Sequence, residues 1–340
     1  MKSSPPPGWA FNSVAVFRAL RLGDMLCAVP ALRALRAGLP EARITLVGLP
    51  WAAAFARRFA RYVDDFIAFP GDARLPEEPV RRERLAPFYR SMRLRRFALA
   101  IQLHGNGGIT NGIVAAFGAA TMAGFRPGPG RLPGRFLRYP ERGQESLRLA
   151  RLAEYLGMPE ADPRLEFPLE RGDYEELHAS GLAARLSGRP YVCVHPGASN
   201  ADKRWHPEAF AAVGDRLAEE FGVSIVLTGS AAERDVVARV AAAMRRPAIK
   251  AASAISVGAL AALMNDARLL VCNDTGVSHI AAGLRLPSVV VFSNSDIERW
   301  APLDHRLHAC VWKPDTRDAW LVLAHARRLL RDHPSRSRAS

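Results

Sequence analysis

Short apolar runs alternate with longer amphipathic segments through the second half of the chain, and this alternation limits the possible folds more than any other sequence feature. An apolar run of about four to eight residues is typical of a strand, whereas apolar positions that recur every three or four residues indicate a helix. Strands that alternate with helices form a parallel sheet, so the second half is predicted to be an α/β domain. The predicted strands cover residues 191–194, 223–227, 268–272 and 288–292, and the predicted helices cover residues 207–221, 232–244, 257–265 and 276–284.

The first half shows a weaker form of the same alternation. A strand over residues 14–17 leads through a short loop to Asp24, a candidate helix N-cap. The helix that follows is expected to run to about Gly38, with Pro30 kinking it or marking its first regular turn. A strand over 44–48 completes a βαβ unit, so the first half is also predicted to be α/β.

A chain of 340 residues is long enough for two domains. We place the boundary between residues 187 and 188, after a predicted helix over 174–186 and before the strand that begins at Tyr191. Glycine and proline are dense over residues 126–140, which predicts a long irregular loop there.

The cysteines are widely separated and include no C-x-x-C pair, so we predict buried free thiols in a reducing compartment. The first residues lack the apolar core of a signal peptide, and the longest uncharged stretch, residues 105–125, is too rich in glycine to span a membrane. A cytoplasmic protein is therefore expected. The four cysteines are Cys27, Cys193, Cys272 and Cys310.

The net charge is +14, and residues 81–96 carry seven arginines against the single acid Glu83. Such a surface suits an anionic partner. The alternative is a compositional preference, because 43 of the 47 basic residues are arginine. No zinc-finger spacing, basic-zipper heptad or RNA-recognition motif accompanies the charge, so nucleic acid is not expected as a partner.

Four predicted strand-to-helix loops are rich in functional groups. Ligands of open parallel sheets bind outside the carboxyl ends of the strands, so these loops are the expected site. They are residues 21–24, 195–205, 229–233, and 273–276 with His279 one turn later.

The loop after the strand at 268–272 has the clearest chemistry. Thr275 and Gly276 open a helix whose free N–H groups favour an anion such as a pyrophosphate, and His279 is placed to face the same space. The alternative is a plain N-cap by Asp274 or Thr275, with His279 as a satisfied polar residue.

Each of three charged residues in the other loops has two interpretations, one as a functional residue and one as a structural residue. Lys203 would neutralise a departing phosphate or lie on a surface loop. Glu233 would bind ribose hydroxyls or act only as a first-turn acid. Asp24 would accept a proton from an attacking hydroxyl, or would cap its helix for about 1 kcal/mol.

Several motifs are missing from the chain. No G-x-G-x-x-G follows the first strand, and no Walker loop or G-x-S-x-G elbow is present, which argues against a nicotinamide-dependent dehydrogenase. No D-x-D stands near a sheet end, so we expect chemistry that needs neither metal nor cofactor.

Taken together, these segments resemble glycosyltransferase family 9, the ADP-heptose:lipopolysaccharide heptosyltransferases. The resemblance covers about residues 14–320 and rests on five pieces in family order. They are Arg21-Leu22-Gly23-Asp24 with Pro30-Ala31-Leu32, His195-Pro196-Gly197-Ala198, Lys203-Arg204-Trp205, the segment 229–233, and Asn273-Asp274-Thr275-Gly276 with His279.

The resemblance implies a GT-B fold, in which two Rossmann-like α/β/α domains face each other across a cleft. Residues 14–187 would bind the acceptor and residues 188–314 the nucleotide-sugar. A C-terminal helix over 315–333 would pack back on the first domain, and the ends, 1–13 and 334–340, would be disordered.

The resemblance also implies inverting transfer of heptose from an ADP-sugar, with Asp24 as general base. Lys203 and the helix terminus at Thr275 and Gly276 would stabilise departing ADP in place of a metal. The acceptor would be the anionic lipopolysaccharide core at the cytoplasmic face of the inner membrane. The implied donor-site residues further include Ser199, Glu233, Asp274 and His279, and the implied acceptor contacts are Arg21, Gln102 and His104.

The chain departs from the family pattern after residue 292, where Ser293-Asn294-Ser295-Asp296 replaces the common Gly-Pro-Thr turn. This puts the donor sugar in doubt. Two alternatives stay open: a GT-B enzyme for another nucleotide-sugar, such as a UDP-sugar transferase or epimerase, and a binding protein without turnover.

Overall fold

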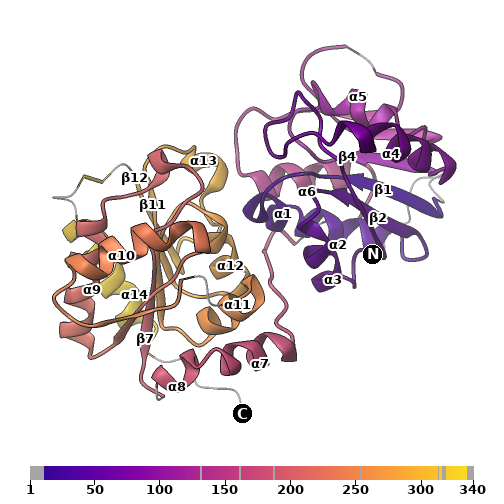
Figure 1. Ribbon diagram of the computed structural model, residues 1–340. Helices are drawn as coiled ribbons and strands as arrows, with labels where there is room; N and C mark the ends of the chain where they lie inside the picture. The colour runs from indigo at the N-terminus through magenta and orange to yellow at the C-terminus, as the bar shows by residue number, and fades with distance from the viewer. Residues whose placement is uncertain are drawn as a thin grey trace. The chain divides into compact units, whose positions relative to one another are not determined.

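The computed structural model describes residues 11–130, 132–160, 162–186, 188–252, 255–312, 314–315 and 319–334 (Figure 1). The disordered ends expected at 1–13 and 334–340 lie largely outside these ranges, although residue 13 already begins a strand. The chain forms two compact units that divide between Leu165 and Glu166.

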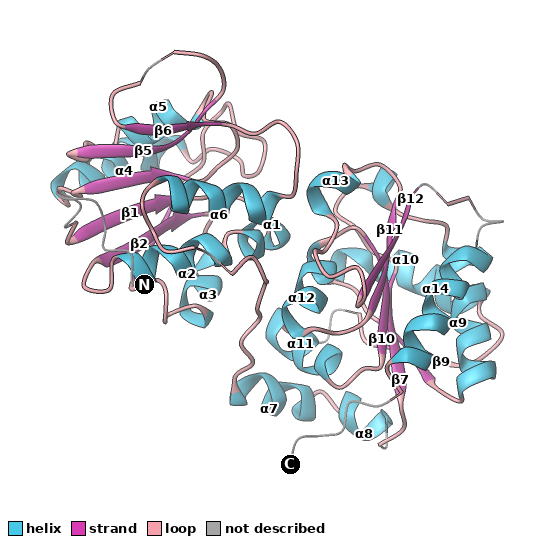
Figure 2. Ribbon diagram, turned by 180° about the vertical axis from the view of Figure 1, so that it is seen from behind, coloured by secondary structure: helices cyan, strands magenta, loops and turns pink. Residues whose placement is uncertain are grey.

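The first unit is built on a six-stranded parallel sheet with the order β3-β2-β1-β4-β5-β6. Helices α4 and α5 cover one face, and α2 and α6 pack together on the other (Figures 1 and 2). The strands are β1 (Ser13–Phe17), β2 (Arg43–Gly48), β3 (Asp65–Ala68), β4 (Leu99–Gln102), β5 (Thr121–Arg126) and β6 (Arg135–Arg138), and the helices are α1 (Leu22–Cys27), α2 (Val29–Gly38), α3 (Ala52–Arg58), α4 (Arg82–Leu94), α5 (Thr110–Ala115) and α6 (Glu145–Tyr155).

The second unit repeats the plan with the strand order β12-β11-β10-β7-β8-β9, again all parallel. Helices α11 and α12 lie on one face, and α9, α10 and α14 lie on the other (Figure 2). The strands are β7 (Tyr191–His195), β8 (Ser224–Leu227), β9 (Ala248–Lys250), β10 (Leu269–Asn273), β11 (Ser288–Phe292) and β12 (His308–Trp312), and the helices are α7 (Arg171–Ala179), α8 (Leu182–Leu186), α9 (Pro207–Phe221), α10 (Arg234–Ala243), α11 (Val257–Asn265), α12 (Gly276–Leu284), α13 (Ile297–Trp300) and α14 (Ala319–Asp332).

The four strands predicted in the second half, and the helices between them, are confirmed to within a few residues. Their apolar runs are fully buried, as in β10 and β11, because both faces of the sheet are covered. Strand β5 and the edge strands β6, β9 and β12 were not predicted. Strand β6 lies inside the expected irregular loop 126–140, where it pairs with β5.

The helix predicted from Asp24 to Gly38 is two helices, α1 and α2, with Ala28 between them. Pro30 stands in the first turn of α2, where its missing N–H is not needed, which confirms one of its two expected roles.

The domain boundary lies earlier than the predicted 187–188. Helix α7 packs against α11, so it belongs to the second unit. A Cβ added at Gly283 of α12 would come 2.7 Å from the backbone carbonyl carbon of Glu166. The backbone at the start of the second unit therefore lies directly against α12. The division therefore falls 22 residues before the predicted boundary.

The C-terminal helix also differs from expectation. Val322, Ala326 and Leu329 of α14 are fully buried in the core cluster of the second unit, together with Val271 and Val291 of its sheet. The prediction that this helix packs back on the first domain is wrong, because its apolar face is part of the second unit's own core.

All four cysteines are free thiols, as predicted, although Cys310 is partly exposed. Burial raises the pKa of the Cys193 thiol to about 12, so it is inert at neutral pH. Among the described residues, no helix is long and apolar enough to cross a membrane.

Candidate active site

The second unit gathers its polar loops at the carboxyl ends of neighbouring strands, and buried Asn273 at the end of β10 joins two of them. Its side chain accepts a hydrogen bond from the Trp205 backbone N–H at 2.9 Å and donates one to the Pro196 carbonyl at 2.8 Å. The loop after β7 is thereby held over the end of β10.

This attachment brings Lys203 to Asp274. Lys203 ends a short 3₁₀ turn, Ala201–Lys203, and its Nζ lies 3.5 Å from Asp274 Oδ2. The Asp274 side chain is only 5% exposed, whereas Lys203 is 26% exposed and reaches solvent. Lys203 and Asp274, both predicted for the donor site, are therefore in contact.

Helix α12 begins at this point, with Thr275 in extended conformation before Gly276. No capping hydrogen bond is made by the Thr275 side chain, so the plain N-cap interpretation fails for it. Instead Ser278 Oγ donates to the Thr275 carbonyl at 2.8 Å. The free N–H groups at the start of α12 and the Thr275 hydroxyl together suit an anion.

His279 is buried one turn into α12. Its ring meets the edge of Trp300 with 6.2 Å between the ring centroids, so it packs against α13. Ser199 lies exposed in the loop after β7.

Glu233 is held from three sides at the end of the 3₁₀ turn Ala231–Glu233. Its Oε2 accepts hydrogen bonds from the Ser230 N–H at 2.7 Å and the Ser230 hydroxyl at 2.8 Å, and it lies 3.7 Å from His195 Nε2. A Cβ added at Gly197 would come 2.2 Å from this carboxyl group, so a larger residue there would have to displace it. Glu233 is thus a capping acid, as the plain interpretation has it, and also part of a buried cluster.

The protonation of this cluster follows from burial. Burial lowers the pKa of His195 below its ordinary value, against the charge of Glu233, so the ring is neutral at pH 7. Its Nδ1 lies 3.0 Å from the Thr228 hydroxyl. Burial alone would raise the pKa of Glu233, but His195 and the Ser230 hydrogen bonds hold it below its ordinary value. Glu233 is therefore ionised at neutral pH.

One contact of the second unit was missed by sequence reasoning. Asn294 Nδ2 donates to Asp202 Oδ2 at 2.6 Å, which ties the loop after β11 to the turn that carries Lys203. Asn294 belongs to the segment that replaces the family's Gly-Pro-Thr turn, so this departure was its only signal.

In the first unit, Asp24 stands in the first turn of α1. The helix begins at Leu22 after an extended Arg21, so Asp24 is not the N-cap, and that interpretation is wrong. Asp24 is half-buried, and its carboxylate makes no hydrogen bond or ion pair within the part of the chain that the structure describes.

Arg21 and His104 meet at Glu77, a residue that sequence reasoning missed. Arg21 donates to the Glu77 carbonyl at 2.8 Å, and His104 Nε2 lies 3.6 Å from Glu77 Oε1. The other ring nitrogen, Nδ1, accepts from the Ala19 N–H at 3.3 Å. Burial would raise the pKa of Glu77, but His104 and Arg21 outweigh it and lower the pKa.

Gln102 has a different role from the predicted acceptor contact. Its Oε1 accepts from the Phe125 N–H at 3.1 Å, and its Nε2 donates to the Thr110 hydroxyl at 2.8 Å and to the His104 carbonyl. The side chain is fully buried. Gln102 therefore joins β4, β5 and α5, and its amide is occupied without a ligand.

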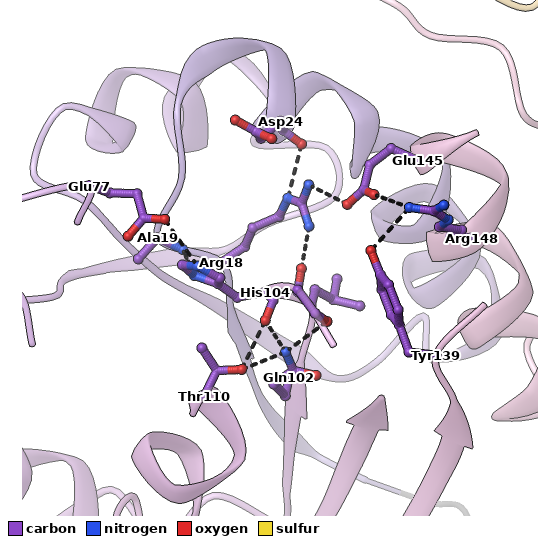
Figure 3. A network of polar contacts seen from close by, with 12 residues as sticks. Arg18, Ala19, Asp24, Glu77, Gln102, His104, Thr110, Tyr139, Glu145 and Arg148 are labelled. Atoms are coloured by element: carbon purple, nitrogen blue, oxygen red, sulfur yellow. Dashed lines mark hydrogen bonds and ion pairs between the residues drawn. The ribbon is translucent and has the colours of Figure 1, made fainter. Parts of the chain in front are cut away.

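Figure 3 shows a further group that the sequence did not reveal, in which buried Arg18 is surrounded by Asp24, Glu145 and the segment at His104. Arg18 follows β1 directly, and a charged residue directly after the apolar run 14–17 was the available signal. Over the described ranges, no group of three or more His, Cys, Asp or Glu side chains is arranged to hold a metal ion.

Two parallel sheets, each with helices on both faces, make this a GT-B protein, as predicted. Solved structures agree: a glycosyl transferase family 9 protein from Veillonella parvula aligns with a TM-score of 0.79 and 20% identity, covering 94% of this chain and 98% of that one. The ADP-heptose lipopolysaccharide heptosyltransferase II of E. coli aligns with a TM-score of 0.74 and 22% identity, covering 95% and 100%.

The family model for glycosyltransferase family 9 (heptosyltransferase) matches residues 144–318, and the chain belongs to this family. Lipopolysaccharide heptosyltransferase 1 of Pseudomonas aeruginosa is 36% identical over 132 residues, which are 38% of this chain and 36% of that protein. The segments matched in the curated relatives span between 36% and 45% of their length.

Proposed function

We propose that this protein transfers a heptose from ADP-heptose to a sugar of the lipopolysaccharide inner core, with inversion at the anomeric carbon. Membership of the heptosyltransferase family supports the reaction class, and the similarity to lipopolysaccharide heptosyltransferases supports the sugar and the acceptor. The ADP moiety follows from the family resemblance.

The contact between Lys203 and Asp274 beside the start of α12 carries the proposal. When the bond between the anomeric carbon and the phosphate oxygen breaks, negative charge develops on the diphosphate. Lys203 and the free N–H groups around Thr275 and Gly276 would stabilise that charge, and in this proposal they take the place of a metal. Glu233 would receive the ribose hydroxyls, since its ionised carboxylate is an acceptor only.

Asp24 would serve as the general base. An acceptor hydroxyl attacks the anomeric carbon, its proton passes to the Asp24 carboxylate, and ADP leaves from the opposite face. A base must have a free lone pair, and within the described residues the Asp24 carboxylate has no competing partner.

The acceptor would bind the first unit. Arg21 lies three residues before Asp24, and Arg18 joins the Asp24 backbone to the residue before His104. Helix α4 presents exposed arginines at positions 82, 84, 90 and 93. These groups suit the phosphates and carboxylates of an inner core, and contact with an anionic membrane face belongs to the same proposal.

ADP release tests the proposal. Purified protein would receive ADP-heptose with and without a heptose-deficient lipopolysaccharide acceptor, beside Asp24→Asn and the exposed control Glu41→Gln. We expect acceptor-dependent ADP release that falls about 10²-fold or more in Asp24→Asn and stays unchanged in the control. Turnover of a UDP-sugar alone would refute the donor, and nucleotide-sugar binding without any turnover would refute the enzymatic role.

A further inference from the structure

Arg18 is the centre of a buried polar network at the carboxyl end of β1 (Figure 3). Its side chain is 0% exposed. Its Nε donates to the Asp24 carbonyl at 2.9 Å, one terminal nitrogen donates to the Leu103 carbonyl, and the other donates to Glu145 Oε1 at 3.1 Å. One guanidinium therefore joins α1, the end of β4 and α6.

Glu145 is itself held from the other side. Its Oε2 lies 3.6 Å from Arg148, and Arg148 donates to the Tyr139 hydroxyl at 3.1 Å and to the Glu141 carbonyl at 2.7 Å. Both Glu145 and Arg148 are buried. Since each partner is fixed in turn, the Arg18 guanidinium has one orientation, and its planar fork sets the directions of all three hydrogen bonds.

Two of the three acceptors lie in segments of the candidate site. The Asp24 carbonyl belongs to the proposed base, and the Leu103 carbonyl directly precedes His104. The residue after Arg18 adds a third connection, because the Ala19 N–H donates to His104 Nδ1. The Asp24 carboxylate has no partner of its own among the described residues, so its backbone determines where it lies.

We infer that Arg18 is a positioning residue for the acceptor side of the reaction: it holds the backbone of Asp24 and the segment that carries His104 at a fixed spacing. This inference rests on the proposed function for its effect on catalysis. A buried ion pair by itself is a poor source of stability, because desolvation offsets much of the attraction. The choice of arginine at this position is explained by the three directed bonds.

The test compares Arg18→Lys with the matched control Arg33→Lys. Arg33 lies on α2 and also donates to two backbone carbonyls of the first unit, those of Asp162 and Arg164, which are outside both site segments. A lysine ammonium keeps the charge and loses the planar fork. Glu145→Gln is the second variant, because it keeps an oxygen acceptor and removes the counter-charge.

Hydrogen exchange and kinetics are measured on the full chain. We expect faster amide exchange confined to residues 20–27 and 103–110 in Arg18→Lys, a smaller change in the same segments in Glu145→Gln, and none in Arg33→Lys. We also expect kcat to fall roughly 10- to 100-fold in Arg18→Lys, since a displacement of about 1 Å can reduce a rate about 10²-fold. KM for the nucleotide-sugar should stay within about twofold, because the proposed donor residues belong to the other unit.

The two proposals fail separately. Unchanged exchange in both segments, or a wild-type kcat in Arg18→Lys, would overturn the positioning role. Absence of ADP-heptose turnover in the wild type would overturn the proposed function, while the exchange experiment would still decide whether Arg18 orders the two segments.

Discussion

Lys203 Nζ lies 3.5 Å from Asp274 Oδ2, although the two residues follow different strands of the second sheet and are 71 positions apart in sequence. The carboxylate is buried and the ammonium is partly exposed, so the lysine is attached at the site and still faces solvent. A group in this position can meet an incoming diphosphate without first being ordered.

Replacing Lys203 with methionine should reduce kcat about 10²- to 10³-fold, because one electrostatic contact to the departing diphosphate is lost. Initial rates of ADP release measure this change. Lys250→Met, at the exposed end of edge strand β9, removes the same charge outside the four predicted loops and should retain the wild-type rate. Equal losses in the two variants would count against a role for Lys203 in the leaving-group step.

Gly197→Ala should displace the Glu233 carboxylate, because the added Cβ would lie 2.2 Å from it. We expect weaker ADP binding and a loss of about 1–3 kcal/mol of unfolding free energy from overpacking. Calorimetric titration with ADP and denaturant unfolding measure the two effects. Gly172→Ala in α7 meets nothing within 4 Å and serves as the control. Wild-type ADP affinity in Gly197→Ala would show that Glu233 does not contribute to nucleotide binding.

His308 should make the protein less stable as the pH falls. Burial lowers the pKa of His308 to about 4, whereas an unfolded histidine titrates near 6.5, so the unfolded chain binds the proton first between those values. The penalty is absent above about pH 6.5, grows by at most about 1.4 kcal/mol per pH unit below it, and levels off near pH 4.

The difference in unfolding free energy between wild type and His308→Asn isolates this effect from other titrating groups. Asparagine can keep the hydrogen bond to the Ser288 hydroxyl, which lies 2.8 Å from His308 Nδ1. The wild-type advantage should shrink from pH 7 to pH 4. A difference independent of pH would contradict a depressed pKa.

Leu329→Ala should destabilise the second unit by about 2–5 kcal/mol, since Leu329 is fully buried between α14 and the sheet. Trp320, on the same helix, is 64% exposed, and Trp320→Ala should change stability by less than about 0.5 kcal/mol. Thermal unfolding followed by hydrogen exchange would show which unit loses protection. Loss confined to the first unit would contradict the packing of α14 described above.

The central strands and the loops that follow them could be predicted from sequence, whereas several side-chain roles could not. Strands β10 and β11 are buried on both faces, so their apolar runs identify them locally. Gln102 and Arg18 have no such local signature. Whether a polar side chain binds a ligand or joins two strands depends on which acceptors the fold brings within about 3 Å.

By itself, the sequence determined the α/β class, the division into two domains and the loops that carry Asp24, Lys203, Glu233 and Thr275, because hydrophobic period and turn chemistry are local properties of the chain. Only the tertiary structure decided that α14 completes the second core, that the domain boundary precedes α7, and that Arg18 joins Asp24 to the segment of His104. These are contacts between residues far apart in sequence. The local sequence of an apolar helix face or of a buried charge does not identify the partner that it contacts in the folded chain.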